Sequence, residues 1–239
     1  MTRYNPVDPA QSLVNKKGCV QTLEQVLADS GIDPEHHLGS THTVLAYGSN
    51  PSPEQIRRKY QNYGDDVVIL LVRGRLKDFD TVYAPFFAHY GSLPAVLQYS
   101  PGTILTTFVS VLSDAHLDLL HQTEGVGSVY CYGRLDNIDL RLDGGHQLNS
   151  THAYLSLLGH LMVGGKNVAL EAIPANNREY SAKSQEEILR WTQTFLGDFQ
   201  AVDQFIVENI HDKGKRSERS RRLQESTNEF LYSDWERVL

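Results

Sequence analysis

Cysteine is scarce in this sequence, and long apolar runs are missing from it. The 239 residues include two cysteines, Cys19 and Cys131. Two cysteines so far apart form neither a disulfide framework nor a zinc-ligand set, which favours a reducing compartment. The longest apolar run, residues 67–72, is far shorter than the roughly 20 residues that cross a bilayer. Residues 1–10 have no apolar core of the kind that a secretion signal needs. We therefore expect a cytoplasmic protein without a membrane partner.

Positive charge is also in short supply. The 22 Lys and Arg are outnumbered by 29 Asp and Glu, which gives a net charge of −7. A general attraction to nucleic acid is therefore not expected. The basic stretch 213–222 contains Glu218 and no aromatic residue, which favours a solvated helix face or a disordered segment over an RNA contact.

Several common signatures of catalysis and metal binding are absent. The ten histidines lack ligand spacing, and there is no His-Glu-x-x-His or Cys-x-x-Cys, so we expect no metal site. The stretch 159–166 is not a phosphate loop, because its lysine comes one position late and Asn167 replaces the required Ser or Thr. The Gly-x-Ser-x-Gly turn of many serine hydrolases is also missing.

What is present is a globular composition in which strands and helices alternate irregularly. Residues 1–40 predict a helical extension, residues 41–198 a single domain, and residues 199–239 a charged tail that is helical or partly disordered. In the extension, four apolar residues recur at helical spacing: Val20, Leu23, Val26 and Leu27. Because the strands and helices do not alternate regularly, we expect a mixed α+β fold with a barrel-like sheet and helices on its rim.

Apolar runs and turn residues predict the strands. They are expected at residues 43–47, 67–76, 95–99, 104–112, 129–135 and 153–158, with a turn at residues 100–102.

N-cap residues predict the helices. Ser52, Ser113 and Ser184 each stand directly before a helical pattern, and Gln55 and Glu187 are placed to complete capping boxes. The last of these helices is expected to bury one apolar stripe: Ile188, Trp191, Phe195 and Phe199.

Two places in the sequence are candidates for chemistry, and the first is the loop Tyr47-Gly48-Ser49-Asn50. It connects a predicted strand to a helix N-terminus, a geometry that leaves backbone N–H groups unpaired and pointing one way. Such a loop suits a carboxylate, a phosphate or a developing oxyanion. An ordinary connection capped by side chains uses the same residues, so spacing alone leaves both interpretations open.

The second place is Glu124, between an amphipathic helix and the sequence Gly125-Val126-Gly127. An acidic residue at a helix C-terminus opposes the helix dipole. A protein that keeps Glu there could be using a carboxyl group with a raised pKa as a general acid or base. The simpler alternative is an exposed Glu that merely tolerates its position.

Together, the Tyr-Gly-Ser-Asn loop and the Glu-Gly turn resemble the signature of the γ-glutamylcyclotransferase-like superfamily. The resemblance continues through residues 75–79, 93–102 and 117–126. It covers residues 43 to about 135 well and extends more loosely to about 197.

This resemblance implies an enzyme that cleaves a small γ-glutamyl amine or peptide. The substrate's own α-amine attacks its γ-carbonyl, which releases 5-oxoproline and needs no metal or cofactor. Glu124 would act as the general base and then as the acid. The implied substrate-binding residues are Tyr47, Gly48, Ser49, Asn50, Tyr130 and Tyr180.

Three residues depart from the family pattern. Pro51 replaces a usual Leu or Met and could remove an apolar wall. Thr107 replaces a frequent Gly and adds bulk near the pocket. His121 replaces a common Asp, and if charged it would favour the ionised form of Glu124. Two alternatives therefore stay open: a γ-glutamyl-binding module with weak or no catalysis, and an enzyme that removes a γ-glutamyl protecting group from a biosynthetic intermediate. The leaving group and the oligomeric state also stay open.

Overall fold

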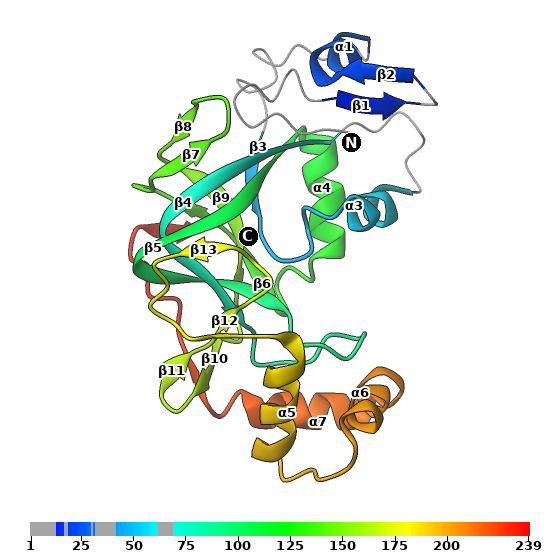
Figure 1. Cartoon of the computed structure of the whole chain (residues 1–239), viewed down its shortest axis with the longest axis vertical. Coiled ribbons are helices and arrows are strands. Elements are labelled where there is room, and N and C mark those ends of the chain that lie inside the picture. Colours follow the sequence, from blue (N-terminus) through cyan, green and yellow to red (C-terminus); the bar gives the residue numbers. More distant parts are fainter. Residues whose placement is uncertain (1–12, 17–18, 30, 32–41, 62–68) are drawn as a thin grey trace.

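The computed structural model describes residues 13–16, 19–29, 31, 42–61 and 69–239 (Figure 1). Its elements follow in chain order: β1 (Leu13–Lys16), β2 (Cys19–Thr22), α1 (Leu23–Asp29), β3 (His42–Ala46), α3 (Pro53–Tyr60), β4 (Leu70–Tyr83), β5 (Ala95–Leu112), α4 (Asp114–Thr123), β6 (Tyr130–Leu135), β7 (Leu140–Leu142), β8 (Gln147–Leu148), β9 (Thr151–Ser156), β10 (His160–Val163), β11 (Lys166–Asn167), β12 (Ala169–Leu170), β13 (Ala175–Asn176), β14 (Ala182–Lys183), α5 (Gln185–Phe195), α6 (Val202–His211), α7 (Lys213–Leu223), β15 (Thr227–Asn228) and β16 (Trp235–Arg237).

Among the described residues, eleven strands form one large curled sheet, and the others form the β1-β2 hairpin and a small β11-β10-β15 sheet. The main path of the large sheet runs β14-β12-β4-β5-β3-β9-β6-β16, and β7, β8 and β13 are attached at its sides. β3 pairs antiparallel with β5 and parallel with β9, so it lies inside the sheet. Figure 1 shows α3 and α4 on one side of the sheet, with α5, α6 and α7 grouped at one end of the molecule. The fold is therefore the expected mixed α+β class with helices on the rim.

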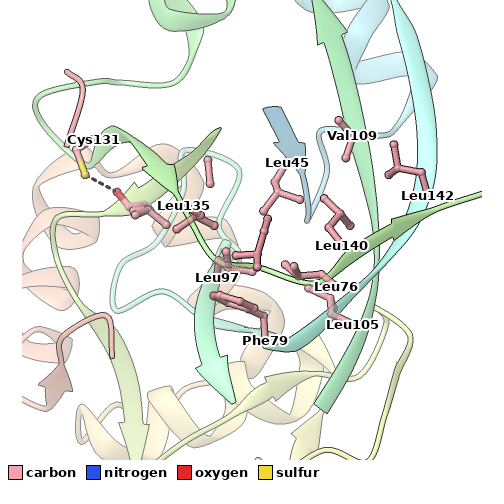
Figure 2. Packing of buried hydrophobic residues seen from close by; sticks show 13 residues of the cluster. Leu45, Leu76, Phe79, Leu97, Leu105, Val109, Cys131, Leu135, Leu140 and Leu142 are labelled. Carbon is pink, nitrogen blue, oxygen red and sulfur yellow. Dashed lines mark hydrogen bonds between the residues drawn. The ribbon is translucent and has the colours of Figure 1, made fainter. Parts of the chain in front are cut away.

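The main core lies on the side of the sheet where β3, β4, β5, β6 and β7 contribute leucines and Phe79. Figure 2 shows these side chains meeting, with Leu45 of β3 among them. Full burial of each such side chain stabilises the fold by about 1.5–3 kcal/mol. Because Leu45 is 1% exposed, it anchors the end of β3 from which the candidate loop departs.

β5 is one continuous strand, so the predicted turn at residues 100–102 is wrong. The pairing of β5 with β4 passes from Tyr99 opposite Phe79 to Ile104 opposite Lys77, which leaves only Asp78 across from the intervening residues. Gly102 has a φ of +82°, and its N–H donates to Asp78 Oδ1 at 2.7 Å. The Pro-Gly pair therefore produces a bulge within a strand, and no chain reversal occurs.

Two of the three predicted helix starts have the expected caps. Ser113 Oγ accepts the N–H of His116 at 3.3 Å. Ser184 and Glu187 form a complete capping box. Ser52 does precede α3, but its Oγ donates to Glu54 at 2.8 Å and caps no backbone group, so the capping box predicted there is wrong.

The predicted apolar stripe behind Ser184 is only partly buried. Ile188 is fully buried, but Phe195 is 43% exposed and Phe199 is 88% exposed. Helix α5 ends at Phe195, so Phe199 lies beyond it. Trp191 stacks on Phe195 with ring centroids 5.0 Å apart, and the two rings partly cover each other at the surface.

The two predicted extensions contain helices, as expected, and also strands and packing that the sequence did not predict. At the N-terminal side, β1 and β2 form a hairpin, and α1 begins only at Leu23, so Val20 lies in a strand. In the C-terminal 199–239 segment, α6 and α7 contribute Phe205 and Leu223 to a buried cluster, and β16 pairs with β6. These last residues are therefore part of the packed fold. None of the described helices is long and apolar enough to cross a membrane.

Candidate active site

The Tyr47–Asn50 loop leaves β3 as a tight turn. Gly48 has a φ of +69°, and a Cβ at this position would lie 3.0 Å from the Cβ of Ala95, so glycine is needed both for its backbone angle and for space. Within the described residues, no acceptor is hydrogen-bonded to the amides of Gly48, Ser49 and Asn50. Two side chains that could have capped the loop are engaged elsewhere: Ser52 with Glu54, and Asn50 with Lys59 and Glu124. The loop amides are therefore available to a ligand.

Tyr47, the first residue of this loop, has its hydroxyl group hydrogen-bonded to a neighbouring strand. Its Oη donates to the backbone carbonyl of Tyr154. Burial raises the pKa of Tyr47 well above its usual value, and the neighbouring Tyr130 and Glu124 add to the effect. The phenol is thus neutral, and it ties the loop to β9.

Glu124 is the C-cap residue of α4, as predicted from the sequence. The next residue, Gly125, has a φ of +61°, and a Cβ there would lie 2.9 Å from Val129. The N–H of Val129 donates to the Gly125 carbonyl at 3.1 Å, and the N–H of Gly127 donates to the Tyr130 carbonyl at 2.7 Å. This compact turn fixes Glu124 and Tyr130 relative to each other.

The Glu124 carboxylate is mostly buried and is held through one oxygen. Its side chain is 12% exposed, which rules out the exposed-Glu alternative. Oε1 accepts Asn50 Nδ2 at 3.2 Å and also accepts Lys59 Nζ. In the described part of the chain, no donor is hydrogen-bonded to Oε2. One oxygen is therefore held in place, while the other keeps its lone pairs for a substrate.

Lys59 is a charged residue of the site that no sequence pattern predicted. It lies in the last turn of α3, and its Nζ donates to Asn50 Oδ1 at 2.9 Å as well as to Glu124. Its side chain is 14% exposed. The sequence did contain a signal, because the helix that follows the loop ends in three basic residues, Arg57, Arg58 and Lys59. Basic residues are common at helix C-termini, where they interact favourably with the helix dipole, so this run did not by itself indicate a site.

These residues line one cleft of about 790 Å³. Four loop residues, Glu124 and Tyr130 all belong to its wall, together with Lys59 and Arg58. Apolar side chains complete the lining: Phe86, Phe87, Leu93, Val129, Leu170 and Ile173. The cleft therefore combines a charged group with apolar surface. Its volume falls in the range typical of small-molecule sites.

The other two tyrosines that the resemblance implied, Tyr130 and Tyr180, differ in their relation to the cleft. Tyr130 lines the cleft, and its ring is 6.2 Å from that of Phe86. Burial raises the pKa of Tyr130, and Glu124 raises it further, so its hydroxyl stays protonated. Tyr180 is not among the described residues that line the cleft. Its Oη donates to the Tyr99 carbonyl at 2.7 Å, and it packs against the buried cluster of Val82, Ala84 and Val96, as Tyr130 does.

The three departures from the family pattern have limited effects on this cleft. Neither Pro51 nor Thr107 is among the described lining residues. Thr107 is buried in β5 opposite Gly74. Burial lowers the pKa of His121, and its Nδ1 lies 2.9 Å from Tyr154 Oη. A neutral His121 does not supply the positive charge considered above, and Lys59 supplies it instead.

Metal ligands do not gather in this cleft. Over residues 13–16, 19–29, 31, 42–61 and 69–239, no three His, Cys, Asp or Glu side chains are close enough to hold an ion together.

Comparison with known proteins gives fold-level likenesses. No family model matches the sequence, and neither does any curated protein. A solved structure named γ-glutamyl cyclotransferase has a TM-score of 0.40 and 15% identity, covering 81% of this chain and 91% of the other. An uncharacterized protein from Homo sapiens also has a TM-score of 0.40 and 15% identity, over 81% and 92% of the two chains. An AIG2-like protein from Mus musculus has a TM-score of 0.36 and 14% identity, over 49% and 78%. The fold is similar to these structures, but likeness at this level assigns no role to any residue.

Proposed function

We propose that this chain is an enzyme of the γ-glutamyl cyclotransferase type, acting on a small γ-glutamyl amine or peptide. The observation that supports this most is the position of Glu124. Its carboxylate lies in the same cleft as the unpaired loop amides, with Oε1 held by Asn50 and Lys59. A base and a set of N–H donors around one small-molecule cleft are what an intramolecular aminolysis needs.

In the first half of the reaction, the substrate's α-amine attacks its own γ-carbonyl carbon. A C–N bond forms, the π electrons of the carbonyl move to its oxygen, and the amine nitrogen gives a proton to Glu124. The amides of Gly48, Ser49 and Asn50 bind the glutamyl group and stabilise the developing oxyanion. Holding the glutamyl chain folded brings nucleophile and carbonyl together, which turns ring closure into a matter of positioning.

In the second half, the tetrahedral intermediate collapses. The carbonyl re-forms, the bond to the leaving amine breaks, and Glu124 returns its proton to that amine. The products are 5-oxoproline and a free amine, and no water is consumed. One carboxyl group therefore serves as base and then as acid.

The experiment that tests this proposal compares two Glu→Gln variants. Glu124→Gln removes the base but keeps the shape, so we expect at least a 10²-fold loss of 5-oxoproline release from γ-glutamyl amides, the usual contribution of acid–base catalysis. Glu186→Gln is the matched control, because Glu186 is exposed on α5, where it pairs with Arg190, and is not among the described residues that line the cleft. Full turnover by Glu124→Gln would end the proposal.

A second candidate is a binding module that holds γ-glutamyl compounds without turning them over. The Lys59–Glu124 ion pair favours it, because this pair occupies Oε1 of the carboxylate that the reaction would use. Calorimetric binding of a γ-glutamyl amide by the wild-type protein, with no 5-oxoproline formed over hours, would support this candidate over the enzyme.

A further inference from the structure

We propose that Lys59 binds the α-carboxylate of the γ-glutamyl group and exchanges its ion pair with Glu124 for one with the substrate. This inference rests on the proposed function and deepens it. It makes Lys59 the residue that selects substrates carrying an α-carboxylate, and it makes substrate binding the event that releases Glu124.

Lys59 is placed between the two parts of the site. Its Nζ contacts Glu124 Oε1 from one side and Asn50 Oδ1, in the loop, from the other. Both members of the ion pair are largely shielded from solvent, at 14% and 12% side-chain exposure. A charge in such surroundings needs a partner, because leaving it unpaired costs its full desolvation.

Among the described residues that line the cleft, Arg58 and Lys59 are the two with permanently charged cationic side chains. The guanidinium of Arg58 is engaged by Gln55, with Nη2 2.6 Å from Oε1. Lys59 instead bridges the loop to the carboxylate that the proposed reaction uses. Its long, flexible side chain and its single ammonium group allow it to change partners without moving the helix.

The chemistry of a γ-glutamyl group fits this exchange. Its α-carboxylate and its α-amine are attached to the same carbon. If the ammonium of Lys59 pairs with the α-carboxylate, the α-amine is brought to the vicinity of Glu124. Without Lys59, the negative charges of the substrate and of Glu124 would face each other across the cleft, which disfavours binding.

Two substrates and two enzymes isolate this interaction. A γ-glutamyl alkylamide and the matching 4-aminobutyryl alkylamide share the amine nucleophile, the carbonyl and an uncharged leaving group, and differ only in the α-carboxylate. The ratio of their kcat/KM values is compared between the wild-type protein and Lys59→Met. Because the same ratio is taken for both enzymes, the intrinsic difference in reactivity between the two substrates cancels.

We expect Lys59→Met to reduce the preference for the γ-glutamyl substrate by about 10- to 100-fold, the usual worth of a charged hydrogen bond. The loss should appear mainly in KM. Lys59→Arg, which keeps the charge, should restore part of the preference. Arg57→Met is the matched control, because Arg57 lies on the same helix, is exposed and is not among the lining residues.

The outcomes separate this inference from the proposed function. If the wild-type protein turns over no γ-glutamyl amide, the proposed function fails. If it is active and Lys59→Met keeps the full preference, the inference alone is overturned. If Lys59→Met raises kcat/KM equally for both substrates, the ion pair is only inhibitory and the inference is again overturned. A thermal melt of each variant confirms that the compared proteins are folded.

Discussion

Two partly buried cations in this molecule, Lys59 and Arg219, both pair with carboxylates. The two sites differ in how much hydrogen-bonding capacity stays unused. In the cleft, Lys59 pairs with a Glu124 carboxylate of which one oxygen has no hydrogen-bond donor among the described residues. Between the C-terminal helices, Arg219 donates to Asp198, Glu208 and Asn209. The first arrangement keeps spare hydrogen-bonding capacity beside a cleft, whereas the second uses several donors of one side chain within the packed helices.

The choice of cation agrees with this difference. The Arg219 guanidinium is planar, lies 4.2 Å above the Phe205 ring and presents several N–H groups in fixed directions. It is suited to hold α6 and α7 together permanently. The Lys59 ammonium is a single point charge on a flexible stem, which suits a partner that changes. In this comparison, the cation that engages three neighbouring side chains serves stability, and the carboxylate with one oxygen left over lies beside the cleft.

The largest expected effect concerns the ion pairs that Arg219 forms with Asp198 and Glu208. Arg219→Met leaves Asp198 and Glu208 without their shared cation and Asn209 Oδ1 without its donor, so we expect a clear loss of stability. Urea unfolding should show this loss, while activity per folded molecule stays unchanged. A variant that is as stable as the wild-type protein would remove the contrast between the two pairs.

The next effect concerns the Tyr47–Asn50 loop, which lies beside the Lys59–Glu124 ion pair. Gly48→Ala forces a side chain into a φ of +69° and within 3.0 Å of Ala95 Cβ. The loop must shift, and loss of one aligned N–H donor lowers kcat by about 10²–10³-fold. Steady-state kinetics give the rate. Gly102→Ala is the control, because Gly102 also has a positive φ, but a Cβ added there would meet no described atom within 4 Å, and Gly102 is not among the described lining residues of the cleft. Equal activity of the two variants would contradict a role for the loop amides.

Much of the fold around this loop could be predicted from local sequence. β3, the start of α3 at Pro53, the Ser113 cap and the Glu124 position all follow from apolar runs and capping chemistry. These features depend on neighbours within a few residues, which a linear pattern contains.

What the sequence did not predict depends on distant partners. The bulge at Gly102 needs Asp78 across the sheet, and the integration of the last residues needs strand pairing between β16 and β6. Lys59 was missed for the same reason, because its partner Glu124 is 65 residues away. Tyr180 was included by resemblance, but its hydroxyl is bonded to the Tyr99 carbonyl, a pairing that no local pattern contains.

The smallest expected effect is a pH dependence of stability that arises from Glu208, one of the two carboxylates paired with Arg219. Hydrogen bonds from Lys215, Gln200 and Arg219 lower the pKa of Glu208 to about 2, from an ordinary value of 4.5. A carboxyl group with a lowered folded-state pKa adds stability above its unfolded pKa, and this stability is lost as pH falls through the folded pKa. The melting temperature of Glu208→Gln should therefore lie below that of the wild-type protein at pH 7, and the gap should close between pH 4.5 and 2. Glu186→Gln, at an exposed helix pair, should show little gap at any pH, since such pairs contribute little. A gap for Glu208→Gln that stays constant with pH would mean that its charge does not stabilise the junction of α6 and α7, leaving Asp198 as the carboxylate that balances Arg219.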